Sequence, residues 1–72
     1  MPTLTHALGN NLRRERERKD WSRAVLARRS GVSTATISRV EIEGHTPKLA
    51  ALQSLAVALD IQVQDLLEEV AK

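Results

Sequence analysis

The 72-residue sequence contains no cysteine, no tyrosine and no phenylalanine, and its single tryptophan is Trp21. Without cysteine, neither a disulfide nor a thiolate metal site can hold the fold. One aromatic side chain is too few to build a stacking platform for single-stranded nucleic acid. No apolar run approaches the roughly 18 residues that a transmembrane helix needs, and the N-terminus lacks the apolar segment of a signal peptide. We therefore expect a soluble, cytoplasmic protein.

Residues that perform catalysis or bind metals are also scarce. A nucleophile would have to be a serine, but no serine has a histidine and an acid at a recognisable spacing. The two histidines, His6 and His45, are far apart and have no carboxylates at ligand spacing. A chain this short also has little room for a substrate pocket. The sequence predicts no enzyme activity, no metal and no cofactor.

The composition is that of a globular protein, and the charge is unevenly distributed. Hydrophobic residues make up 42% and charged residues 28% of the chain, which favours one folded domain over residues 1–72. Residues 1–39 contain nine basic and three acidic side chains, a net charge of +6, whereas residues 40–72 have a net charge of −4. A basic half predicts contact with a polyanion. The alternative is an ordinary solvated charged surface.

Apolar residues recur at helical spacing along most of the chain and do not alternate as they would in strands. Leu4, Leu8 and Leu12 predict a first helix that ends near residue 18, while Ser22 and Ser33 are suitable N-caps for the next two helices. We expect an all-α, compact five-helix bundle, with Pro47 in the first turn of the fourth helix. The later helices are expected at 23–29, 34–42, 47–59 and 63–70, with inward positions at Leu26, Ile37, Val40, Leu49, Leu52, Leu55, Ala56, Leu59, Leu66, Leu67 and Val70.

The segment 23–42 has the spacing of a helix-turn-helix. Ala27 is small enough for the next helix to pack closely, and Gly31 can adopt the positive φ of a tight turn. Ile37 and Val40 lie where the second of the two helices must bury its inner face. This arrangement leaves the outer face of that helix available for a DNA major groove.

These features are similar to those of lambda-repressor-like helix-turn-helix regulators, the Cro and xenobiotic-response-element type. The likeness extends from about Leu8 to Leu67. The matching residues are Leu8-Gly9, Leu12-Arg13, Arg16, Trp21-Ser22, Leu26-Ala27, Gly31-Val32-Ser33, Ile37-Ser38-Arg39-Val40-Glu41, Pro47, Leu49, Leu55-Ala56, Ala58-Leu59 and Asp65-Leu66-Leu67.

The resemblance implies a role for several residues. The helix over residues 34–42 would be the recognition helix in the major groove, and Arg16 with Glu41 would form a structural ion pair. The helix N-terminus at Ser33 offers backbone N–H groups to a phosphate. The implied DNA-binding residues are Arg23, Ser33, Thr34, Ala35, Thr36, Ser38, Arg39 and Lys48.

The sequence departs from the family pattern at four places. Arg23 replaces the usual glutamine, which exchanges an amide for a charge that favours phosphate. Glu15 replaces a residue that is commonly apolar, and Asp20 stands where glycine often ends the first helix. Gly44 follows Glu43, one position from the glycine that the family pattern leads us to expect.

We predict a transcriptional regulator that binds double-stranded DNA, as a homodimer on a palindromic operator. The candidate dimer surface is Leu66, Leu67 and Val70, although these side chains can also close the core of the single chain. Two alternatives remain. One is an antitoxin or adaptor whose main partner is a protein. The other is the N-terminal DNA-binding part of a longer, effector-responsive regulator.

Overall fold

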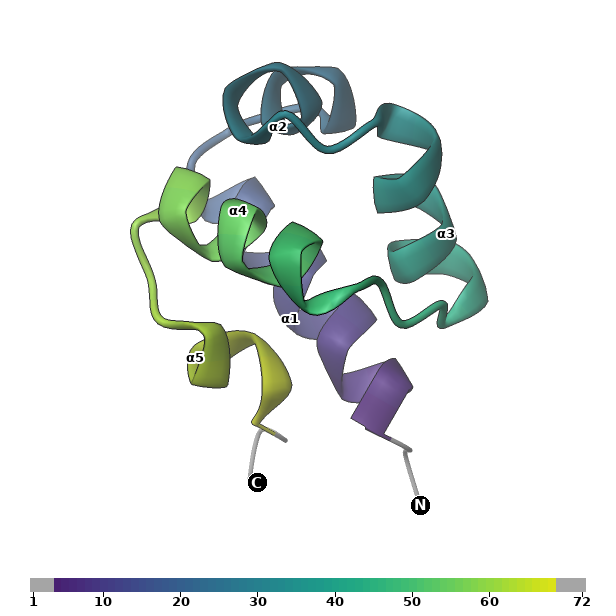
Figure 1. Ribbon diagram of the computed structural model, residues 1–72. Helices are drawn as coiled ribbons and strands as arrows, with labels where there is room; N and C mark the ends of the chain where they lie inside the picture. The colour runs from purple at the N-terminus through teal and green to yellow at the C-terminus, as the bar shows by residue number, and fades with distance from the viewer. Residues whose placement is uncertain (1–3, 69–72) are drawn as a thin grey trace.

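The computed structural model describes residues 4–68, and over this range it contains five α-helices and no strand. The all-α prediction is therefore confirmed. α1 packs against α3 and α5, while α2 packs against α3 and α4 (Figure 1). The helices are α1 (Leu4–Arg18), α2 (Arg23–Ser30), α3 (Thr34–Glu43), α4 (Leu49–Leu59) and α5 (Val63–Leu67).

Side chains from all five helices form the hydrophobic core. Most of the positions expected to face inward are buried, and the partly buried Val32, Ala27 and Trp21 pack against them. Because each helix is short, none of them buries its apolar face without the others. The core consists of Leu8, Leu12, Leu26, Ile37, Val40, Leu52, Leu55, Ala56, Leu59 and Leu66.

The start of α4 differs from the expectation. The helix begins at Leu49, with Lys48 as its N-cap, so Pro47 precedes the helix and is not in its first turn. The prediction that Leu49 faces inward is wrong, because this side chain is 63% exposed. Pro47 is buried at this end of the helix instead. The side chain of Leu4 lies outside the described residues.

The turns around the helix-turn-helix follow the predicted capping. The Val25 amide donates to the Ser22 hydroxyl at 3.1 Å, and the Thr36 amide donates to the Ser33 hydroxyl at 3.1 Å. Gly31 has φ = 79°, a conformation that side chains with a Cβ rarely adopt, and its amide donates to the Ala27 carbonyl at 2.8 Å. α2 and α3 each extend one residue beyond the predicted end.

A buried asparagine attaches α5 to α1. The Asn11 amide nitrogen donates to the backbone carbonyls of Leu66, at 2.8 Å, and of Glu68. Its side-chain oxygen accepts a hydrogen bond from Arg14 at 2.9 Å. The last carbonyls of a helix have no partner within that helix, and Asn11 supplies one from a neighbouring helix. No pattern of apolar residues could have indicated this contact.

Candidate nucleic-acid interface

α2 and α3 form the helix-turn-helix, and the inner face of α3 is closed to solvent. Ile37 and Val40 are fully buried against the core. The connection from Gly31 to Ser33 is too short for the two helices to separate, so α3 lies across α2 with its opposite face outward (Figure 1). This outer face is the candidate recognition surface.

The predicted recognition residues lie on or beside this outer face. Thr34, Ala35 and Arg39 are exposed, while Thr36 and Ser38 are half-buried. The Ser33 hydroxyl donates to the Thr36 hydroxyl at 3.0 Å and also accepts from the Thr36 amide, so these two side chains hold each other at the start of α3. Thr36 therefore has less freedom to turn toward a ligand than Thr34.

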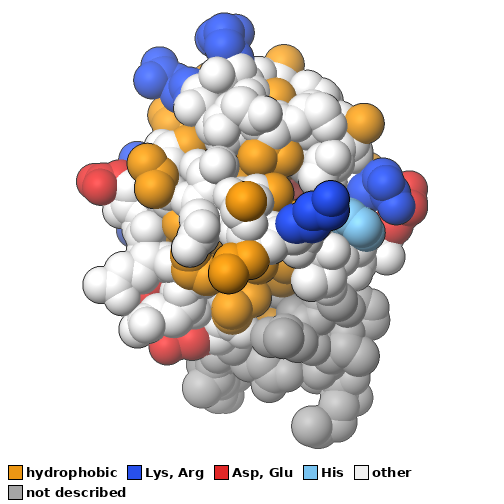
Figure 2. All heavy atoms as spheres, in the orientation of Figure 1, with side chains coloured by type: hydrophobic (Ala, Val, Ile, Leu, Met, Phe, Trp, Pro, Cys, Tyr) orange, Lys and Arg blue, Asp and Glu red, His pale blue; other side chains and the backbone are white. Residues whose placement is uncertain are grey.

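Basic side chains accompany this face. Arg39 is exposed on α3, and Lys48 is exposed at the end of the loop that follows it. Figure 2 shows Lys and Arg side chains on either side of a histidine near the α3 end of this loop. Gly44 ends α3 with φ = 76°, and the amides of Gly44 and His45 both donate to the Arg39 carbonyl. Gly44 lies one position from where the family pattern places a glycine, and α3 is also one residue longer than predicted. The two differences therefore belong together.

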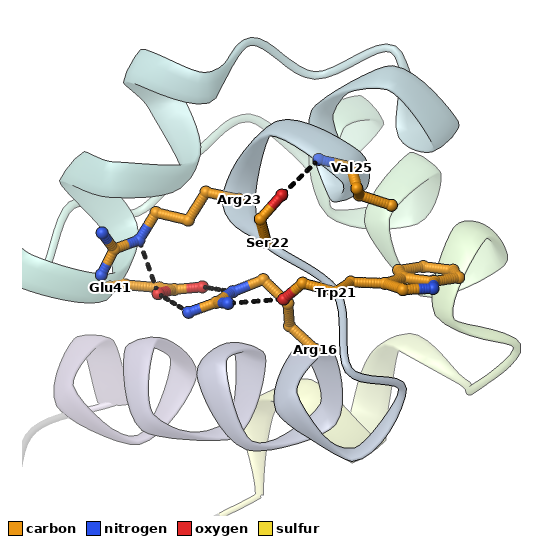
Figure 3. A network of polar contacts seen from close by, with 6 residues as sticks. All are labelled: Arg16, Trp21, Ser22, Arg23, Val25 and Glu41. Atoms are coloured by element: carbon orange, nitrogen blue, oxygen red, sulfur yellow. Dashed lines mark hydrogen bonds and ion pairs between the residues drawn. The ribbon is translucent and has the colours of Figure 1, made fainter.

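A network of three charged side chains connects α1, α2 and α3 (Figure 3). Arg16 Nε lies 2.9 Å from Glu41 Oε2, and Arg16 Nη2 lies 2.9 Å from Glu41 Oε1. Arg16 Nη1 donates to the Trp21 carbonyl at 2.8 Å. One guanidinium therefore binds both oxygens of the carboxylate and also fixes the loop between α1 and α2. The predicted ion pair is present in this geometry.

The burial of this pair gives it a structural character. The Glu41 side chain is 1% exposed, so its charge requires a close partner. The hydrogen bonds to Glu41 raise the pKa of the Arg16 guanidinium above its ordinary value, although burial opposes this effect. The guanidinium therefore keeps its positive charge beside the carboxylate.

Arg23 also binds Glu41, which the sequence analysis did not anticipate. Arg23 Nε donates to Glu41 Oε1 at 3.0 Å, and the Arg23 side chain remains 35% exposed. The hydrogen bond to Glu41 is made by Nε and not by either of the two terminal nitrogens (Figure 3). The sequence did contain a signal for this contact. Arg23 replaces the glutamine that the family favours, and Glu41 was already predicted to bind an arginine.

The predicted dimer surface needs correction. Leu66 is fully buried in the core of the single chain, because the Asn11 hydrogen bonds hold α5 against α1. It therefore cannot contribute to a surface. Leu67 is half-buried, and Val70 lies outside the described residues. Of these three positions, Leu67 is the one with described, partly exposed surface.

Two features were looked for in the part of the chain that the structure describes, a cluster of metal ligands and a membrane-spanning helix. Among the side chains that the structure describes, those of residues 7–68, no group of three or more His, Asp or Glu is arranged to hold a metal ion. None of the helices over residues 4–68 has the length and apolar character that crossing a membrane requires.

Comparison with known proteins gives consistent matches. The helix-turn-helix domain family matches residues 7–70. Among characterised proteins, the chain is similar to the HTH-type transcriptional regulator SutR of Escherichia coli K12, with 31% identity over 61 residues. This alignment covers 85% of the chain but 34% of SutR, so the chain spans about a third of that relative's length.

Two solved structures have a closely similar fold. The hypothetical transcription factor NHTF from Neisseria superposes with a TM-score of 0.86 and 31% identity, covering 93% of this chain and 77% of that one. The restriction-modification controller protein C.AhdI from Aeromonas hydrophila superposes with a TM-score of 0.80 and 32% identity, covering 86% of this chain and 94% of that one. The chain therefore belongs to the helix-turn-helix family of DNA-binding transcriptional regulators, and not to a family of enzymes.

Proposed function

We propose that the chain binds double-stranded DNA in a sequence-dependent manner by inserting the outer face of α3 into the major groove. The observation that carries this proposal is the contrast between the two faces of α3. One face is sealed by Ile37 and Val40, and the other presents the short polar side chain of Thr34 and the charge of Arg39. A helix with this division fits the width of a major groove.

Direct reading of bases is modest in this proposal. Thr34, Ala35, Thr36 and Ser38 carry short side chains, whose methyl groups and hydroxyls discriminate weakly between base pairs. Arg39 is the one recognition residue here that can bind a guanine through two hydrogen bonds. The shape and deformability of the DNA supply the remaining specificity.

Affinity comes mainly from contacts to phosphates. Arg23 and Lys48 provide charged side chains, and the N-termini of α2 and α3, capped by Ser22 and Ser33, provide backbone N–H groups. Each neutralised phosphate releases counterions, so binding weakens as salt increases. These contacts fix the orientation of α3 without reading sequence.

The functional unit in this proposal is a homodimer on a palindromic operator, since one domain of this size covers about one half-site. Leu67 and Val70 remain the proposed dimer residues, without Leu66. Because SutR is about three times as long as the matched region, an effector-responsive part beyond such a domain is consistent with the same proposal.

Selection from a pool of random duplexes at two salt concentrations tests the function. The expected result is an enriched palindrome, with binding at least about tenfold weaker at roughly 200 mM than at 50 mM salt. A pool that remains random at both concentrations, with no measurable affinity, would contradict the proposal.

A protein partner is the second candidate, and exposed apolar side chains favour it. Leu49 is 63% and Val57 is 79% exposed on α4, so this helix has apolar surface that a protein partner could cover. In this case the chain would act as an antitoxin or adaptor, and duplex binding would be weak and without sequence preference.

A further inference from the structure

Arg23 is anchored at only one part of its guanidinium. Its Nε–H group is hydrogen-bonded to Glu41 Oε1, whereas no dashed line joins Nη1 or Nη2 to another residue drawn in Figure 3. A guanidinium has five N–H donors in a fixed plane, so the bond at Nε leaves the four donors of Nη1 and Nη2 without a hydrogen bond to any residue that the structure describes. The bond at Nε also fixes the orientation of that plane.

The carboxylate that anchors Arg23 is itself held from the opposite side. Arg16 binds both oxygens of Glu41, and Glu41 Oε1 accepts hydrogen bonds from Arg16 Nη2 and Arg23 Nε together. With two arginines around one carboxylate, the network carries a net positive charge. The burial of Glu41 keeps its negative charge away from an approaching polyanion, while Arg23 remains partly exposed.

The position of Arg23 is suited to the DNA backbone. It is the first residue of α2, directly after the N-cap Ser22, where the helix dipole also favours an anion. A phosphate near this end would meet backbone N–H groups and the terminal nitrogens of Arg23. Arginine binds phosphate through two parallel hydrogen bonds, which require a fixed plane.

We propose that Glu41 is a positioning residue for DNA binding, because it orients Arg23 so that Nη1 and Nη2 grip a backbone phosphate while Arg16 neutralises the carboxylate. This inference rests on the proposed function and adds a residue to it. Glu41 itself does not touch the DNA. Glu41 orders the long Arg23 side chain before DNA binds, so less conformational entropy is lost on binding.

A merely structural role makes a different prediction. If Arg23 only strengthens the contact between α2 and α3, its replacement lowers stability but leaves DNA binding by the folded protein unchanged. A positioned phosphate ligand, in contrast, changes both the affinity and its salt dependence. The two roles are therefore separable at a temperature where every variant is folded.

The first experiment measures the affinity of the folded chain for a selected duplex against salt concentration. Arg23→Ala is expected to reduce the slope of log K against log salt by about one, the value for one phosphate contact. Arg23→Lys keeps the charge and so keeps the slope, but it loses the Nε–H group, and affinity is expected to fall by about tenfold. Arg28→Ala, an exposed arginine on the same helix, is the control and should leave the slope unchanged.

The second experiment is a double-mutant cycle that tests Glu41 directly. In the Glu41→Gln background, Arg23→Lys is expected to lower affinity by less than about twofold, because the orientation has already been lost. Glu41→Gln removes a negative charge, which by itself changes the affinity for DNA. This change cancels when Arg23 and Arg23→Lys are compared with the same residue at position 41. If Glu41→Gln does not fold, the cycle is made with Glu41→Asp, whose shorter side chain draws the carboxylate back from Arg23.

The outcomes distinguish this inference from the proposed function. If the wild-type chain binds the duplex with a steep salt dependence but Arg23→Ala leaves both affinity and slope unchanged, the proposed function stands and the inference is wrong. An equal effect of Arg23→Lys in both Glu41 backgrounds would also overturn it. If the wild-type chain binds no duplex at low salt, both fail together.

Discussion

Gly9 of α1 lies directly against the backbone of Val40 in α3. A Cβ atom at Gly9 would be 2.5 Å from the Val40 carbonyl oxygen and 3.4 Å from Glu41 Cα. Since Gly9 and Arg16 are two helical turns apart, they lie on the same face of α1. The close approach at Gly9 therefore brings α3 near enough for Arg16 to bind Glu41.

Replacing Gly9 with alanine is expected to destabilise the fold by about 1–3 kcal/mol, although alanine favours helix more than glycine does. The obstacle is backbone, which cannot rotate away as a side chain can. Urea denaturation followed by the fluorescence of Trp21 measures the change. The exposed neighbour Asn10→Ala is the control and should retain or slightly raise stability; an equal gain from Gly9→Ala would mean that the helices are not in contact there.

Arg16→Lys is expected to lower stability by about 1–3 kcal/mol, because lysine cannot bind both Glu41 oxygens and the Trp21 carbonyl at once. The pKa of Arg16 is raised in the fold, so its stabilisation is complete below the unfolded-state pKa and is lost only as pH rises through the folded-state value. Titration of the guanidinium should therefore leave stability unchanged between about pH 5 and pH 9. Denaturation of the wild-type and Arg16→Lys proteins at several pH values in this range checks the prediction. The difference in stability between them should be constant, and a difference that shrinks with rising pH would mean that Arg16 loses its proton there.

Asn11→Ala is expected to lower stability by about 1–3 kcal/mol, because the buried carbonyl of Leu66 and the partly buried carbonyl of Glu68 lose their donor. The effect should concentrate at α5. Hydrogen exchange of the α5 amides should accelerate more than exchange in α2. Uniform acceleration in both helices would show that Asn11 supports the whole core and not the attachment of α5.

Asp20→Gly is expected to raise stability by up to about 1 kcal/mol, because Asp20 has φ = 59° and a glycine adopts this conformation without steric cost. The greater freedom of glycine in the unfolded chain offsets part of the gain. The contrasting control is Glu17→Gly within α1, which should lose about 1 kcal/mol. Thermal unfolding of the three proteins provides the comparison, and a loss at both positions would contradict the argument.

Local patterns predicted most of the fold. Ser22 and Ser33 are recognisable caps, and the spacing of Ile37 and Val40 identifies the inner face of α3 without any knowledge of its neighbours. Leu49 was assigned incorrectly because helical spacing continues to the end of a helix, even where no neighbouring helix covers it. Position along a helix, and not only its face, decides whether a side chain is buried.

The contacts that sequence reasoning missed join residues that are distant in the chain. Asn11 reaches α5 across 55 positions, and Arg23 reaches Glu41 across 18. A buried asparagine and a partly exposed arginine look like ordinary surface residues in a sequence. The packing of α1 against α5 brings Asn11 to its partners, and the packing of α2 against α3 brings Arg23 to Glu41.

Chemical-shift mapping of the labelled chain with its selected duplex tests the central claim most directly. The account predicts that the largest amide shifts occur at Ser33, Thr34 and Arg39 of the recognition region, and at Ser22 and Lys48 beside it. The amides of α5 should change little when the duplex carries a single half-site, because no second chain then binds beside the first. The largest shifts on α5 or on the exposed face of α4, with α3 unaffected, would contradict the claim that α3 reads DNA.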